Sequence, residues 1–256
     1  MGILEGKNIL VAGVTHHTSI AYEVARIAQA EGATVLVSNF GRALSLTKRV
    51  IQKLEPTPAV LELDVTNTEH LAGLPDAIRE HVPHLDGVVH SVAFANPETA
   101  LGGAFLTTGW DDVATSLHVS AYSLASLTMA CKPVFAETAS VVGLTFDASV
   151  SWPAYDWMGV SKAALESTSR YLARYLGKDG IRSNIVAAGP IETIAKKAIP
   201  GASSFNDVWA ERAPLGWEPT NAEPTAKAVV ALLSDFFPAT TGEVIHVDGG
   251  LHSTGA

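Results

Sequence analysis

The sequence predicts an α/β protein built on one doubly wound, Rossmann-like parallel sheet with helices on both faces. Short apolar runs rich in Val and Ile alternate along the chain with longer runs in which apolar residues recur at helical spacing. A strand, a helix and a second strand are joined by a right-handed crossover, which makes the sheet parallel. Because the 256 residues contain no repeat and no linker-like tract, we expect a single domain over residues 1–256.

The expected elements follow one another along the whole chain. The first strand, residues 8–12, ends at Gly13, and the next helix repeats Ile20, Val24 and Ile27 on one face until Gly32. Further strands are expected at 34–38, 59–63, 87–90, 139–142, 182–186 and 243–247, and further helices at 44–54, 68–79, 111–130, 157–176 and 225–233. Ligands of such sheets bind beyond the carboxyl ends of the strands, so functional residues are expected in the loops that follow the strands.

Composition narrows the class of protein. Hydrophobic residues make up 47% of the chain and charged residues 17%, which excludes a disordered protein. The net charge of −9, from 17 basic and 26 acidic residues, argues against binding to nucleic acid. Cys131 is the single cysteine and lies in an apolar helical run, so we expect an inert core residue and no disulfide framework. The spacing of the histidines indicates no metal site.

The sequence contains no recognisable targeting or membrane-spanning segment. The N-terminal MGILEGK has no basic region followed by an apolar stretch. No stretch approaches the roughly 18 uninterrupted apolar residues that a membrane helix needs. We therefore expect a soluble, cytoplasmic protein that does not bind membranes.

The loop after the first strand, GVTHHTSIA, has the features of a pyrophosphate-binding turn. Gly13 permits a tight turn, and Thr18 or Ser19 is placed to cap the next helix. Free N–H groups and the positive end of the helix dipole, at Ser19 and Ile20, would then face the pyrophosphate. An ordinary strand-to-helix turn has the same features, so this segment alone leaves both interpretations open.

The next three strand ends offer further contacts to a dinucleotide. Phe40 and Arg42 stand where many dinucleotide sites carry an acidic residue; Phe40 can stack on adenine, and Arg42 can stack or meet a 2′-phosphate, so NADPH is not excluded. Asp64 can accept a hydrogen bond from the adenine amino group, with Val65 packed on the ring, or it can simply cap a helix. Small residues that let the backbone approach the cofactor follow the fourth strand, and these are Ser91, Val92 and Ala93.

The segment YDWMGVSK carries the strongest chemical signal. It places Tyr155 and Lys162 seven residues apart at the start of a predicted helix, about two turns, so both side chains share one face. A phenol that hydrogen-bonds a carbonyl oxygen, beside an ammonium that holds a sugar hydroxyl, is the working pair of a nicotinamide-dependent reductase. An amphipathic helix with a core Tyr and a solvated Lys has the same spacing.

Taken together, these motifs resemble the enoyl-acyl-carrier-protein reductases, a branch of the short-chain dehydrogenases. The resemblance rests on DV at 64–65, HSVAF at 90–94, the Tyr-x6-Lys spacing at 155–162 and AGPIET at 188–193. It runs in order over nearly the whole chain, whereas the Tyr-x3-Lys spacing of commoner short-chain dehydrogenases is missing. The resemblance implies NADH-dependent reduction of the 2,3-double bond of a trans-2-enoyl thioester in fatty-acid elongation.

The resemblance also implies roles for individual residues. Tyr155 would hydrogen-bond the thioester carbonyl oxygen, on which charge develops, and Lys162 would bind the nicotinamide ribose. Phe146 matches an aromatic position beside the substrate and is grouped with these two as catalytic. Residues that match the loop contacting nicotinamide and pyrophosphate are Ile191 and Thr193. Ala95 and Met158 are the further expected substrate contacts, although Met158 is equally suited to the core.

Residues 194–214 resemble the family's substrate-binding loop in its shorter version. The resemblance therefore implies a shallow acyl crevice that prefers short to medium chains. Lys196, Lys197 and Arg212 offer positive charge to an acidic carrier protein, partly offset by Asp207 and Glu211. An acyl carrier protein would thus carry the substrate, with a coenzyme A thioester as the alternative. The family resemblance also implies a homotetramer.

Two other functions stay open on the sequence alone. A carbonyl or 3-oxoacyl reductase of the same superfamily needs a Ser before the Tyr and a Tyr-x3-Lys pair; Ser140 is present on the fifth strand, but the pair is not. A catalytically silent dinucleotide-binding sensor would have lost Tyr155 or Lys162, and the chain has both.

Overall fold

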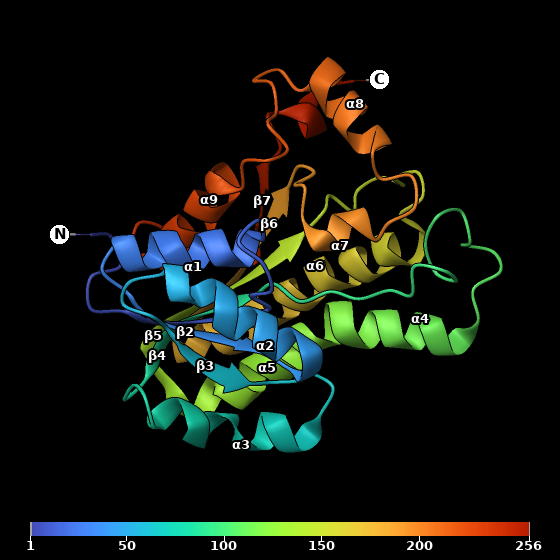
Figure 1. Cartoon of the computed structure of the whole chain (residues 1–256). Coiled ribbons are helices and arrows are strands. Elements are labelled where there is room, and N and C mark those ends of the chain that lie inside the picture. The colour runs from blue at the N-terminus through green and yellow to red at the C-terminus, as the bar shows by residue number, and fades with distance from the viewer. Residues whose placement is uncertain (1, 256) are drawn as a thin grey trace.

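Seven strands run parallel in one sheet, in the order β3-β2-β1-β4-β5-β6-β7 (Figure 1). The computed structural model describes residues 2–255. The strands are β1 Asn8–Ala12, β2 Thr34–Asn39, β3 Ala59–Glu62, β4 Leu85–His90, β5 Phe135–Thr145, β6 Ile181–Ala188 and β7 Val244–Val247. The chain moves outward from β1 to β3 and then returns to the other side of β1 at β4. This order confirms the predicted doubly wound sheet, and the strand ends beside the β1–β4 switch point are where ligands bind.

Helices cover both faces of the sheet. They are α1 Ile20–Ala30, α2 Gly41–Val50, α3 Thr68–Arg79, α4 Trp110–Leu117, α5 Ser123–Cys131, α6 Asp156–Leu176, α7 Ile194–Lys197, α8 Ser204–Arg212 and α9 Glu223–Leu233. The core on one face joins the strands to α1, the end of α2 and α9. The core on the other face joins them to α3, α5 and α6. Figure 1 shows α8 standing off the sheet, near the C-terminus.

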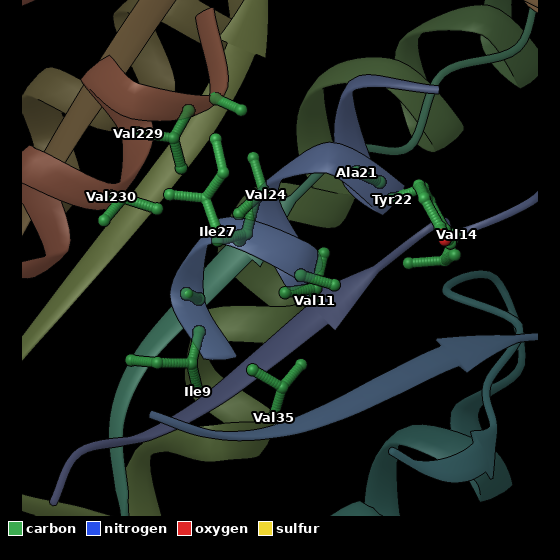
Figure 2. Close-up of a cluster of buried hydrophobic side chains, with 14 of the residues drawn as sticks. Ile9, Val11, Val14, Ala21, Tyr22, Val24, Ile27, Val35, Val229 and Val230 are labelled. Carbon is green, nitrogen blue, oxygen red and sulfur yellow. The ribbon is translucent and has the colours of Figure 1, made fainter. Parts of the chain in front are cut away.

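Successive side chains of β1 point to opposite faces of the sheet, and this decides which core each one joins. Ile9 and Val11 belong to the core under α1 and α9, whereas Leu10 belongs to the core under α3 and α5. Both faces of the strand are therefore buried, which explains why NILVA reads as an almost uninterrupted apolar run. Figure 2 shows the first of these cores, where the labelled side chains from α1 and α9 include Val24, Ile27, Val229 and Val230.

The long helix predicted over residues 111–130 is present, because residues 110–131 are helical throughout, but the stretch is not α-helical at every turn. α4 and α5 are separated by a π-helical turn, His118–Tyr122. In this turn the buried Ser120 Oγ accepts a hydrogen bond from Phe94 N at 2.9 Å and donates one to Phe94 O at 3.0 Å. The wider turn accompanies this contact with the chain after β4, a long-range contact that helical periodicity cannot reveal.

Other element boundaries differ by smaller amounts. β5 is longer at both ends than the predicted 139–142, and α2 begins earlier and ends earlier than the predicted 44–54. Residues 194–214 contain the two short helices α7 and α8. Cys131 is buried in the core as predicted, and burial raises the pKa of its thiol. No helix within residues 2–255 is both long enough and apolar enough to cross a membrane.

Candidate active site

A cavity of about 760 Å³ opens at the carboxyl ends of the strands, at the edge where the fold predicts ligand binding. Its lining comes mainly from the loops after β1 to β6, with residues of α1, α4, α6, α7 and α8. Of the cofactor, catalytic and substrate residues that the sequence proposed, all but Arg42 line this one cavity, and they are Gly13, Ser19, Ile20, Phe40, Asp64, Val65, Ser91, Val92, Ala93, Ala95, Phe146, Tyr155, Met158, Lys162, Ile191 and Thr193. The fold thus brings them together, while the role of each remains a prediction.

The loop between β1 and α1 crosses the end of β4 at close range. Gly13 has a φ of +94°, and a Cβ at this position would lie 2.2 Å from the carbonyl oxygen of Ser91. Ser19 caps α1, because its Oγ accepts a hydrogen bond from Tyr22 N at 3.2 Å. Thr18, the other predicted cap, hydrogen-bonds the ring of His16 instead. The first turn of α1, with N–H groups that helical bonding leaves free, borders the cavity as an anion site requires.

The end of β2 is tied to the same loop. Asn39 Nδ2 donates hydrogen bonds to Val14 O at 2.9 Å and to Thr47 Oγ1 at 3.1 Å, and the Thr47 hydroxyl in turn reaches Val14 O. These contacts tie the second half of α2 to the loop after β1, and Phe40 lies against the cavity with 44% of its surface exposed. Its ring is free to stack on a ligand. Arg42 lies outside the cavity lining, so the structure does not support it as a cofactor contact.

The end of β3 carries Asp64 in a tight turn. Its Oδ1 accepts hydrogen bonds from Thr66 N at 2.9 Å and from Thr66 Oγ1 at 2.7 Å. The cap of α3 is Asn67, whose side chain accepts from Glu69 N and His70 N, so the interpretation of Asp64 as a helix cap is wrong. The turn leaves Asp64 on the cavity wall.

Tyr155 and Lys162 project from the start of α6 into the same cavity. Each is 7% exposed. Lys162 Nζ donates a hydrogen bond of 2.8 Å to the carbonyl oxygen of Leu144 at the end of β5. Burial lowers the pKa of Lys162 to about 8, with a smaller opposing effect from Glu166, and burial raises the pKa of Tyr155. The phenol therefore keeps its proton at neutral pH and can donate a hydrogen bond.

Two further titratable groups lie near Lys162. Glu166 Oε1 accepts hydrogen bonds from Thr145 Oγ1 at 3.1 Å and from Ala148 N at 3.3 Å, and burial raises the pKa of this carboxyl group. The ring of His90 is fully buried and hydrogen-bonded to Ser123 Oγ at 2.7 Å. Burial, and then the charge of Lys162, lower the pKa of His90 to about 3. His90 is therefore neutral and adds no positive charge beside Lys162.

An aromatic cluster borders the other side of Tyr155. The ring of Phe146 lies 5.2 Å from Tyr155 in an edge-on arrangement. Phe205 and Trp209 of α8 lie 5.4 Å from Phe146, and Trp152 lies 5.1 Å away. Aromatic pairs at these separations stabilise one another beyond the burial of their area. The side of the cavity next to the phenol is therefore apolar and suits a hydrocarbon chain.

Comparison with known proteins agrees with this geometry. A family model described as enoyl-(acyl carrier protein) reductase matches residues 13–252. The chain is 45% identical over 263 residues to an enoyl-[acyl-carrier-protein] reductase [NADH] of Mycolicibacterium smegmatis, with 97% of each chain covered. It is 37% identical over 257 residues to the corresponding enzyme of Bacillus subtilis, with 98% of each covered.

The chain belongs to the enoyl-acyl-carrier-protein reductase family.

In this reductase, the lysine at the start of the 194–214 segment is not free for a partner. Lys196 is only 8% exposed; its Nζ pairs with the carboxylate of Glu192 and donates to Asn206 Oδ1 at 2.5 Å. Asn206 Nδ2 in turn donates to Glu192 Oε1 at 2.9 Å. The expectation that Lys196 offers its charge to a carrier protein is therefore wrong, because the charge is used inside the segment. Lys197 remains exposed.

Two tryptophans fasten the reductase's 194–214 segment and the residues after it to the core. Trp209 Nε1 donates to Asp248 O at 3.0 Å, and Trp217 Nε1 donates to Pro190 O at 2.9 Å. Both indoles pack over Gly189, where a Cβ would lie 2.7 Å from Trp217 and 2.8 Å from Trp209 Nε1. The absence of a side chain at Gly189 makes room for both rings.

Several cavity residues carried no motif that marked them. Phe205 of α8, Thr145 of β5 and Thr115 of α4 line the cavity but were not proposed from the sequence. One signal was available for Phe205, which stands four residues before Trp209 and so shares a helix face with it in an otherwise polar segment. The two threonines have no comparable pattern.

Proposed function

We propose that this protein reduces the 2,3-double bond of a trans-2-enoyl thioester with NADH, in the reducing step that completes a cycle of fatty-acid elongation. The observation that supports the proposal most is the placement of Tyr155, a protonated phenol that borders an apolar-walled cavity beside the buried amine of Lys162. The names of the relatives, which are NADH-dependent enoyl-acyl-carrier-protein reductases, support the same substrate and cofactor.

The loop after β1 fits the pyrophosphate of NADH. A Cβ at Gly13 would meet Ser91 O at 2.2 Å, so the backbone there already lies as close to the end of β4 as a glycine allows. The start of α1 supplies free N–H groups beside it. Phe40 and Asp64 would hold the adenine, and Lys162 and Ile191 the nicotinamide riboside. When bound, NADH supplies a hydride from C4 of the nicotinamide to the β-carbon of the substrate.

The residues of the chain stabilise the charge that this transfer creates. As the β-carbon gains the hydride, negative charge moves to the thioester carbonyl oxygen, and Tyr155 donates a hydrogen bond to that oxygen. A preorganised donor of this kind contributes a factor of about 10²–10³ to the rate. The α-carbon then takes a proton, which completes the saturated thioester. Phe146 and Met158 exclude water from the acyl chain.

The acyl chain of the preferred substrate is short to medium in length. Residues 194–214 are the proposed substrate-binding loop, and α7 and α8 within it leave Phe205 against the cavity. A series of thioesters of increasing chain length tests this preference, and a higher kcat/KM beyond C16 would contradict it. Acyl carrier protein is the proposed carrier, with Lys197 as an exposed cation for it, and a parallel series on coenzyme A tests the carrier.

We further propose a homotetramer located in the cytoplasm. Apolar and aromatic side chains are exposed along the neighbouring helices α5 and α6 and the π-turn before α5, and these are Tyr122, Met129, Val160, Tyr171 and Tyr175. Such a surface suits helix-on-helix contacts between copies of the chain. Light scattering after size-exclusion chromatography tests the assembly, and a monomeric mass would contradict it.

A single assay separates the proposed activity from the alternatives. NADH oxidation is followed with crotonyl or 2-octenoyl thioester, with a 3-oxoacyl thioester, and without substrate. We expect oxidation with the enoyl thioesters only. The 3-oxoacyl reductase is disfavoured because Ser140 lies outside the cavity, its Oγ donating to Leu232 O at 2.9 Å. Preference for the 3-oxoacyl thioester would replace the proposal, and NADH binding without any turnover would indicate a sensor.

A further inference from the structure

The turn that carries Tyr155 has an unusual backbone. Ala154 has a φ of +61° and Asp156 a φ of +41°, and these are the non-glycine residues with positive φ in the described part of the chain. They flank Tyr155, which itself has a φ of −88°. Residues with a Cβ rarely adopt this left-handed region, and they keep it only where surrounding contacts enforce it. The position of the phenol therefore depends on whatever holds Ala154 and Asp156.

Asp156 is held by a loop that is distant in sequence. Its Oδ2 accepts hydrogen bonds from Gly103 N at 2.6 Å and from Ala104 N at 3.0 Å. Although Asp156 is the first residue of α6, its carboxylate thus bonds the loop between β4 and α4. The same loop contacts the turn twice more, because Gly102 N donates to Ala154 O at 2.9 Å and Trp157 N donates to Ala100 O at 3.3 Å.

An aromatic pair strengthens this attachment next to the carboxylate. The rings of Phe105 and Trp157 stack with centroids 5.0 Å apart, and Trp157 Nε1 donates to Phe105 O at 3.0 Å. The loop over residues 100–105 therefore contacts Ala154, Asp156 and Trp157, the residues on both sides of Tyr155. Such a set of contacts fixes the turn in one position.

The loop also touches the proposed substrate-binding segment. A Cβ built on Gly102 would lie 2.9 Å from Pro200, and one on Gly201 would lie 3.8 Å from the Cβ of Ala154. Pro200 and Gly201 connect α7 to α8. The turn of Tyr155 is consequently enclosed between two segments that border the acyl side of the cavity.

From these contacts we infer that Asp156 is a positioning residue of the reduction, which acts through Tyr155. Its carboxylate fastens the turn to residues 103 and 104 and so holds the phenol at the distance from which it meets the thioester oxygen. This inference rests on the proposed function. A misplacement of about 1 Å at a reacting group lowers the rate by up to about 100-fold, so an anchor at the adjacent residue is expected to influence turnover strongly.

Three substitutions separate the anchor from the backbone strain. Asp156→Ala removes the carboxylate and does not favour positive φ. Asp156→Gly removes the carboxylate but accepts positive φ freely. Asp156→Asn keeps an acceptor oxygen and tolerates positive φ. We expect kcat to fall about 10- to 100-fold in the Ala and Gly variants and to remain within about threefold of wild type in the Asn variant. The Kd of NADH, measured by fluorescence titration, should not change in any of them, which also confirms folding.

A double-mutant cycle with Tyr155→Phe tests whether Asp156 acts through the phenol. Once the hydroxyl is absent, Asp156→Gly should lower kcat little further, because both changes remove the same interaction. The matched control is Asp112→Ala, which releases the same loop from α4, where Asp112 accepts from Thr99 Oγ1 and Asn96 Nδ2. We expect it to lower kcat by less than about threefold.

Three results would overturn the inference. They are wild-type kcat in Asp156→Gly, additive losses in the cycle, and an equally large loss in Asp112→Ala. The proposed function is tested separately by the wild-type enzyme. If wild-type protein does not oxidise NADH with an enoyl thioester, the function fails, whereas an active wild type with an insensitive Asp156 refutes the positioning role alone.

Discussion

The two sides of the cavity are built differently. On the cofactor side, Gly13 and Ser91 follow a strand directly and Asp64 lies two residues after one, and the decisive contacts involve backbone atoms at strand ends. On the substrate side, Phe146 meets Phe205 and Trp209 across about sixty residues of chain, and side chains make the wall. The cofactor side is therefore fixed by the sheet itself, whereas the substrate side depends on segments that the sheet does not position. Substitutions on the two sides should accordingly change different measured quantities.

The largest expected effect comes from the phenol on the substrate side. Tyr155→Phe should lower kcat by about 10²–10³, because one preorganised hydrogen bond to the developing charge is lost. The Kd of NADH should remain near that of the wild type. Steady-state kinetics with crotonyl thioester and a fluorescence titration with NADH measure the two quantities. A parallel loss of NADH affinity would show that the two sides are not separable.

A substitution on the cofactor side should have the opposite signature. Gly13→Ala places a methyl group 2.2 Å from Ser91 O and requires a φ of +94°, so the loop must move. Strain of about 1–3 kcal/mol corresponds to a rise in the Kd of NADH of roughly 5- to 150-fold. Gly73→Ala in α3 is the control, because open space surrounds that position, and it should leave Kd unchanged. Equal effects at both positions would contradict the close contact of the loop with β4.

The pH dependence of NADH binding sharpens the comparison further. Burial lowers the pKa of Lys162 to about 8, so the amine is charged below that pH and increasingly neutral above it. A charge-assisted hydrogen bond is roughly twice as strong as a neutral one, so the Kd of NADH should rise by about three- to tenfold between pH 7 and pH 9. In Lys162→Met this rise of the Kd with pH should disappear. If the Kd of the variant still rises between pH 7 and pH 9, a group other than Lys162 causes the pH dependence.

The smallest expected effect on activity concerns the attachment of α8. Trp209→Phe keeps an aromatic ring but removes the indole donor to Asp248 O, which is left with only the long hydrogen bond of 3.5 Å from Leu251 N. The free energy of unfolding should fall by about 1–3 kcal/mol, and the KM for the enoyl thioester should rise a few-fold while the Kd of NADH stays constant. Thermal denaturation and kinetics measure both, with Trp110→Phe at an exposed position as control. An altered Kd of NADH would argue against the division into two sides.

The difference between the cofactor side and the substrate side also explains which features of the structure the sequence predicts. Strand and helix periodicity placed the doubly wound sheet, and residues such as Gly13 and Asp64 could be located because they lie within two residues of a strand end. The Tyr155 and Lys162 pair was visible because both lie on one helix. The sequence did not reveal the π-turn at Ser120, the burial of Lys196 or the cavity position of Thr145. The positions of Ser120 and Thr145 depend on contacts with residues more than twenty positions away, which local patterns do not encode. The partners of Lys196 are close in sequence, but its burial depends on the fold of the short α7–α8 segment, which has no clear periodicity.

Gly189 sits where the two sides meet, and its constraint is purely one of volume. Its backbone is not left-handed, so dihedral preference alone would admit any amino acid. Yet even a methyl group would collide with both Trp209 and Trp217. Mutations elsewhere can tune nucleotide affinity or acyl preference one at a time, but a change at this position would disturb both together. Engineers who wish to alter one property independently of the other should therefore leave this residue untouched.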